Sequence, residues 1–160
     1  MSVQWQENPY TFYGKQSLSH TARRQAPGSM ECWAYCLGAV AGMDWSSTAQ
    51  FSALDDMIKG QDTAQTYELV ESINKANGVP LLRRTGRWYS PEWNPDQLKE
   101  YFPAAVAIVG HFVVALAIGK APQRPDVVRY WDPADAQIHT VEVEAFKQQF
   151  EPEFSIAKAV

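Results

Sequence analysis

The chain has 160 residues, of which 46% are hydrophobic and 20% charged, close to the composition of an average globular protein. This composition excludes a wholly disordered chain, and the length predicts a single domain over residues 1–160. Fourteen basic residues against eighteen acidic ones give a net charge of −4, so we expect no nucleic-acid partner. Two cysteines are too few for a disulfide framework.

The sequence contains no segment that predicts a membrane span. The longest apolar run, at 104–118, includes His111 and is shorter than the roughly 20 residues that a spanning helix needs. The N-terminus lacks a basic start followed by an apolar stretch, so the sequence predicts no ordinary signal peptide. We therefore expect synthesis in the cytoplasm and no membrane partner.

The first half of the chain predicts an extended segment followed by helices. Residues 1–24 are polar and aromatic, and predict a largely extended N-terminal arm with one short strand. The stretch 29–42 is rich in Ala, and its apolar residues recur three and four positions apart, which predicts a buried helix. Further helices are predicted at 48–58 and 63–76, the latter ended by an Asn-Gly pair.

The second half changes to the pattern of an antiparallel sheet. A short helix is predicted from Pro95 and a terminal helix over 143–150. Short apolar or β-branched runs between turn residues predict strands at 79–84, 104–109, 112–118, 127–131 and 137–143. Helices first and strands later indicate the α+β class.

Cys32 lies at the predicted start of the first long helix. Unpaired backbone amides and the helix dipole at such a position favour a nucleophilic thiolate. The alternative is a buried cysteine that acts as a small apolar residue. That alternative suits Cys36, one full turn further into the helix, and we expect no disulfide between the two because positions four apart in a regular helix have poor disulfide geometry.

His111 begins one predicted strand, and Asp132 ends the next one at an Asp-Pro turn. In an antiparallel pair the start of one strand lies beside the end of the next, so the two side chains are expected to meet. His111 would then serve as general base or acid, and Asp132 would orient its ring. Taken singly, the histidine is also explained as a core or edge residue, and the aspartate as a turn former.

Short motifs around these residues resemble those of a known family. They are Cys32-Trp33-Ala34, Gly110-His111-Phe112-Val113-Val114 and Trp131-Asp132-Pro133, with Gln25 upstream. With them the chain resembles the papain-like cysteine peptidase superfamily over about residues 22–150. It is most similar to the compact bacterial branch of plant-pathogen effector proteases and bacteriocin-leader-cleaving peptidases.

The resemblance implies a papain-like fold, in which a central helix carrying Cys32 packs on a C-terminal antiparallel sheet carrying His111 and Asp132. It implies that Cys32 is the nucleophile, His111 the base and Asp132 the orienting acid. Gln25 would complete the oxyanion hole with the backbone amide of the nucleophile, although it stands seven residues before Cys32, one more than is frequent in the family. The implied reaction is hydrolysis of a peptide bond through a thioester acyl-enzyme, with no cofactor.

The family also implies partners and a destination. The substrate would be a peptide or protein, and an inhibitor, an immunity protein or a host protein would be a further partner. By analogy with bacterial effectors and toxins, a specialised secretion system would export the protein. We expect no metal site, because the two cysteines and three histidines lack a second closely spaced pair of ligands. The oligomeric state is not predicted.

Three other functions remain open from the sequence. A peptidoglycan amidase or endopeptidase uses a similar cysteine and histidine, but its third residue is more often a histidine. A transglutaminase or deamidase shares the Cys-His-Asp order and the Cys-Trp dipeptide. A non-catalytic binding module that kept the papain-like scaffold is the third alternative.

Two other groups of polar residues receive ordinary interpretations. His139 alternates with Ile138 and Thr140 on a late strand and is predicted to lie on the exposed face. A basic cluster at 83–87 predicts a solvated loop, and a subsite for an acidic substrate is its alternative function.

Overall fold

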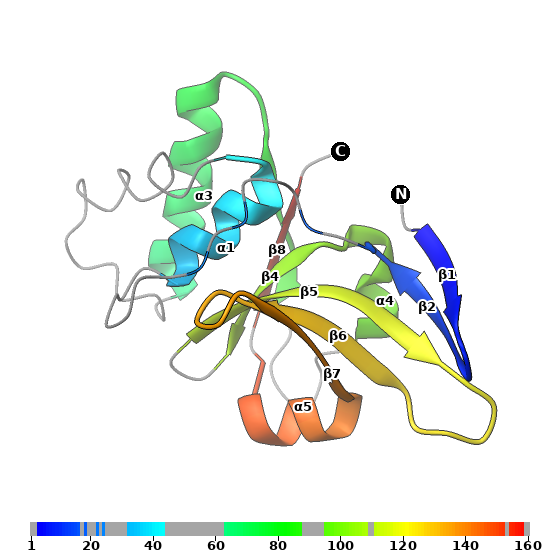
Figure 1. Ribbon diagram of the computed structural model, residues 1–160. Helices are drawn as coiled ribbons and strands as arrows, with labels where there is room; N and C mark the ends of the chain where they lie inside the picture. The colour runs from blue at the N-terminus through cyan, green and yellow to red at the C-terminus, as the bar shows by residue number, and fades with distance from the viewer. Residues whose placement is uncertain are drawn as a thin grey trace.

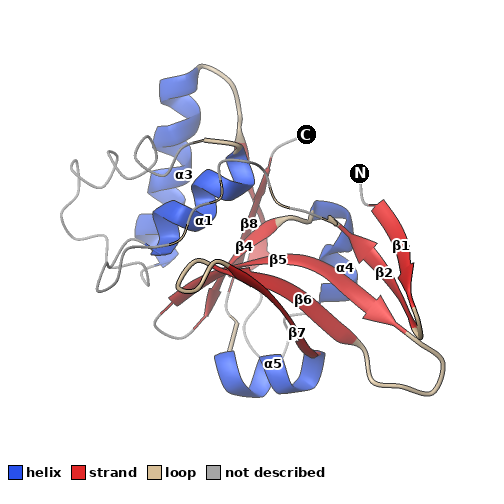
Figure 2. Cartoon of the chain, in the orientation of Figure 1, coloured by secondary structure: helices blue, strands red, loops and turns tan. Residues whose placement is uncertain are grey.

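The computed structural model describes residues 3–16, 18, 22, 24, 32–43, 63–87, 95–108, 111–152 and 154–158. Its helices are α1 (Cys32–Ala41), α3 (Thr63–Asn77), α4 (Pro95–Leu98), the 3₁₀ helix η2 (Lys99–Tyr101) and α5 (Val143–Phe150). Its strands are β1 (Val3–Glu7), β2 (Tyr10–Gly14), β3 (Leu82–Arg87), β4 (Ala104–Ile108), β5 (His111–Lys120), β6 (Val127–Asp132), β7 (Gln137–Glu142) and β8 (Phe154–Lys158). The described residues therefore form an α+β fold, as the sequence predicts (Figure 2).

The long strand β5 organises the sheet, in which every pairing between described strands is antiparallel. The strand order is β1-β2-β5-β4-β8-β3, with β6 paired to β5 and β7 paired to β6. Along one edge of β5, the first half pairs with β4 and the second half with β2, while β6 follows the other edge. The start of β5 and the end of β6 thus lie at the same end of the sheet (Figure 1).

The centre of the sheet is covered on both faces, because α1 and α5 lie on opposite sides of it (Figure 1). Strands buried on both faces need nearly continuous apolar sequences, which explains the composition of β4 and β5. Alternate side chains point to opposite faces. Ala105, Ala107, Phe112, Val114 and Leu116 share a core with Trp33 and Leu37 of α1. Ala104, Val106, Val113 and Ala115 share a second core with Phe146 of α5.

Two predictions about the ends of the chain are wrong. The N-terminal arm contains two strands, β1 and β2, which pair with each other as a hairpin, and β2 also pairs with β5. The predicted terminal helix, α5, does not end the fold, because β8 follows it and pairs with both β4 and β3. Strands β2 and β8 are short segments that pair with distant parts of the chain, which the local sequence pattern does not reveal. The predicted helix at 48–58 lies outside the described residues.

Gly14 allows β2 to approach β5 closely, and its replacement by alanine tests that contact. A Cβ at this position would overlap the carbonyl oxygen of Leu116 and the backbone of Ala117, so we expect the free energy of unfolding to fall by about 2–3 kcal/mol. Gly78→Ala is the matched control: Gly78 also has a positive φ, of 70°, but an added Cβ meets nothing within 4 Å. The control therefore loses only about 1–2 kcal/mol to backbone strain. Urea denaturation measures both, and equal losses would contradict the packing argument.

Candidate active site

Cys32 is the first residue of α1, at the helix end where backbone amides lack partners within the helix. The helix is buried from Cys32 to Val40, which is typical of a helix that is apolar on all sides. It packs against β5, β4 and β8. Cys32 is only 7% exposed, and its thiol is close enough to the ring of His111 to raise the pKa of that ring. The packing of α1 on the sheet therefore brings the thiol to the imidazole.

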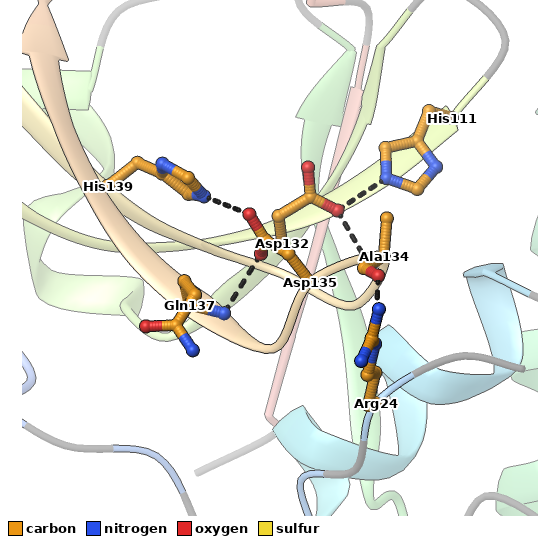
Figure 3. A network of polar contacts seen from close by, with 7 residues as sticks. All are labelled: Arg24, His111, Asp132, Ala134, Asp135, Gln137 and His139. Atoms are coloured by element: carbon orange, nitrogen blue, oxygen red, sulfur yellow. Dashed lines mark hydrogen bonds and ion pairs between the residues drawn. The ribbon is translucent and has the colours of Figure 1, made fainter. Parts of the chain in front are cut away.

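His111 is the first residue of β5 and lies between the thiol and a carboxylate. Its Nε2 is 2.7 Å from Oδ1 of Asp132. Figure 3 shows the two side chains pointing toward each other. Because Nε2 is used in this contact, Nδ1 is the ring atom left to interact with Cys32. Burial lowers the pKa of His111, but the hydrogen bonds to Asp132 and Cys32 and the negative charges of both groups outweigh it and raise the pKa from 6.5 to about 9. His111 is therefore protonated at neutral pH.

Asp132 is the last residue of β6, where the chain turns toward β7. The pairing of β5 with β6 ends at Val114 and Trp131, so Asp132 extends beyond it toward the start of β5. Its Oδ1 also accepts a hydrogen bond from the backbone N–H of Ala134, at 2.9 Å (Figure 3). Burial raises the pKa of Asp132, but the bonds from His111 and Ala134 and the charge of His111 outweigh it and hold the pKa below its ordinary value of 3.8. The carboxylate is ionised and faces a protonated ring.

The structure thus brings together three of the four residues that the sequence singles out, Cys32, His111 and Asp132. The fourth, Gln25, lies outside the described residues. Cys36 is fully buried and has a free thiol, as expected. Burial, and then the negative charges of Cys32 and Asp132, raise the pKa of the Cys36 thiol, so this second cysteine is neutral and unsuited to nucleophilic attack.

The prediction that His139 lies on the exposed face holds only in part, because its side chain is 36% exposed and is packed on one side. Ile138 takes the outward position and is 46% exposed, whereas the ring of His139 is stacked on Tyr130 with centroids 5.2 Å apart. The Nε2 of His139 lies 2.8 Å from Oδ2 of Asp135 (Figure 3). The sequence signal that could have found this pair is the spacing of an acid and a histidine on either side of a turn.

The basic cluster at 83–87 lies on strand β3 and is not a loop. The guanidinium of Arg83 is stacked over the ring of Tyr101, with its carbon 4.5 Å from the ring centroid. This cation–π contact gives Arg83 a packing role. The prediction of a solvated loop is therefore wrong.

In chemical terms, the three residues place a thiol, an imidazole and a carboxylate side by side. A protonated imidazole can stabilise a neighbouring thiolate and can deliver a proton to a leaving group. Asp132 fixes the orientation of the ring and stabilises its charged form. This chemistry suits attack on a carbonyl carbon followed by expulsion of an amine.

Neither metal ligands nor a membrane helix is found in the part of the chain that the structure describes. The described residues include no group of three or more His, Cys, Asp or Glu side chains that could hold a metal ion. None of the described helices is long and apolar enough to cross a lipid bilayer. The chain matches no protein-family model, no curated protein sequence and no solved structure.

Proposed function

We propose that this protein is a cysteine peptidase that hydrolyses peptide bonds through Cys32, His111 and Asp132. The observation that carries the proposal is the position of His111, whose Nε2 lies 2.7 Å from Oδ1 of Asp132 and whose ring is close enough to the Cys32 thiol for that thiol to raise its pKa. The thiol stands at the start of a buried helix, and the other two residues stand at neighbouring strand ends. We further propose that this arrangement of α1 and the antiparallel sheet is papain-like.

The reaction proceeds by acyl transfer. The Cys32 thiolate attacks the carbonyl carbon of the substrate, and the oxyanion is stabilised by the backbone amide of Cys32 and by Gln25. His111 donates its proton to the departing amine, which leaves a thioester on Cys32. Neutral His111 then takes a proton from water, the hydroxide attacks the thioester, and the acid product leaves. The thiolate and the protonated ring are thereby restored.

The test of this function is incubation of the protein with a peptide library, read by mass spectrometry. Cleavage products that require Cys32 would support a peptidase. Ammonia release without chain scission would instead favour a deamidase or transglutaminase, and cleavage of purified muropeptides alone would favour a cell-wall amidase. The absence of every Cys32-dependent reaction would contradict the proposal and favour a binding module.

A further inference from the structure

A second carboxylate–imidazole pair lies next to Asp132, on the turn between β6 and β7 (Figure 3). Asp135 uses both of its oxygens. Oδ1 accepts a hydrogen bond from the backbone N–H of Gln137 at 2.9 Å, and Oδ2 lies 2.8 Å from Nε2 of His139. The stacking of His139 on Tyr130 fixes the ring against β6. The pair therefore ties the turn to the sheet, at a position where both side chains are partly exposed.

The turn holds a backbone conformation that its sequence disfavours. Ala136 has a φ of +57°, in the left-handed region where a Cβ is unfavourable. This conformation places the N–H of Ala136 2.8 Å from the backbone oxygen of Asp132. The backbone N–H of Ala134 donates a hydrogen bond to the side-chain carboxylate of Asp132. The carboxylate of Asp135 accepts a hydrogen bond from the N–H of Gln137, the residue directly after Ala136. Asp135, which is itself bound to His139, therefore holds Ala136 in its strained conformation.

The pair also affects the charge around Asp132. The charge of His139 lowers the pKa of Asp132 and so favours its ionised form. The charged and titratable groups that face this turn or act on it are Tyr130, His111, Cys32, Cys36 and Arg24, whose Nε donates to the backbone oxygen of Ala134.

We propose that Asp135 and His139 are positioning residues, which hold the β6–β7 turn so that Asp132 keeps its contact with His111. This inference rests on the proposed peptidase function. Loss of the pair relaxes the turn, lengthens the Asp132–His111 contact and leaves His111 less strongly protonated. The effect reaches the reaction through His111, so it falls on the chemical step and not on the binding of substrate.

Three variants of the full chain test the inference. His139→Leu keeps the packing on Tyr130 but removes the donor, and is expected to lower kcat about tenfold with KM unchanged, the equivalent of one lost hydrogen bond. His139→Gln keeps a donor toward Asp135 and is expected to recover most of that loss. Ile138→Thr, at the exposed neighbouring position, is the matched control and should leave kcat unchanged.

An NMR titration of the His111 ring gives a second readout that does not depend on catalysis. The resonance is assigned by its loss in His111→Gln, and the pKa of His111 is expected to fall in His139→Leu and to stay near the wild-type value in His139→Gln. An unchanged His111 titration in His139→Leu would overturn the inference, even if kcat or thermal stability falls. If no Cys32-dependent cleavage is found, the peptidase proposal fails, while a lowered pKa of His111 in His139→Leu still supports the positioning role.

The substitution Ala136→Gly tests the link between the Asp135–His139 pair and the strained backbone. Asp135→Ala removes both hydrogen bonds and is expected to reduce kcat as His139→Leu does. Adding Ala136→Gly should restore part of the activity, because glycine adopts a positive φ without a Cβ penalty. A double variant no more active than Asp135→Ala would contradict the proposed route through Ala136.

Discussion

Replacement of Cys32 by alanine is expected to abolish peptide cleavage, with a loss of at least about 1000-fold in kcat/KM. The loss is this large because the substitution removes the atom that forms the thioester, and water held at the same site is a much weaker nucleophile. Alanine lacks only the thiol group of cysteine, so the substitution removes little volume. We therefore expect an unchanged fold, which circular dichroism and the melting temperature check.

Cys36→Ala is the matched control, since it removes the same thiol one helical turn away. Cys36 is fully buried, and its raised pKa keeps it neutral, so this variant should cleave peptides nearly as well as the wild type. A thiol-directed active-site probe should label the wild type and Cys36→Ala but not Cys32→Ala. Equal cleavage or equal labelling of all three proteins would rule out Cys32 as the nucleophile.

The parts of the fold that could be predicted are those whose sequence pattern is local. β4 and β5 are apolar runs bounded by turn residues, and α3 carries a clear helical period with an Asn-Gly end. The contact of His111 with Asp132 also followed from order alone, because the start and end of consecutive antiparallel strands coincide. These features could be predicted because they depend on the local sequence pattern and on the order of the elements along the chain.

Other features depend on distant partners and could not be predicted. In β8 the fully buried Ser155 interrupts the apolar pattern, and the strand forms because β4 and β3 pair with it on both sides. The register of β5 against β6 shifts between Ala115 and Ala117, an irregularity without a sequence signal.

Activity is expected to fall as the pH rises through about 9, which is the pKa of His111 in the folded protein. Above that pH the ring loses the proton that it gives to the leaving amine, so acylation slows. Asp132→Asn keeps an oxygen that can accept the hydrogen bond from Nε2 of His111 but removes the negative charge. The pKa of His111 should therefore fall, and the loss of activity at high pH should begin at a lower pH. Asp132→Ala also removes the bond and should lower kcat by about 100-fold. A series of kcat/KM values against pH measures these effects.

The same ion pair makes stability depend on pH with a defined sign. The folded state raises the pKa of His111 above its ordinary 6.5, so the stabilisation is complete below pH 6.5 and is lost as the pH rises to about 9. The folded state lowers the pKa of Asp132, so its contribution is present above pH 3.8 and is lost as the pH falls through the lowered value. The difference in unfolding free energy between wild type and Asp132→Asn should therefore be largest near pH 5–6 and shrink above pH 9. If this difference in unfolding free energy stayed constant from pH 6 to pH 10, Asp132 would not be the group that holds His111 in its charged form. The loss of activity at high pH would then have to come from the titration of another group.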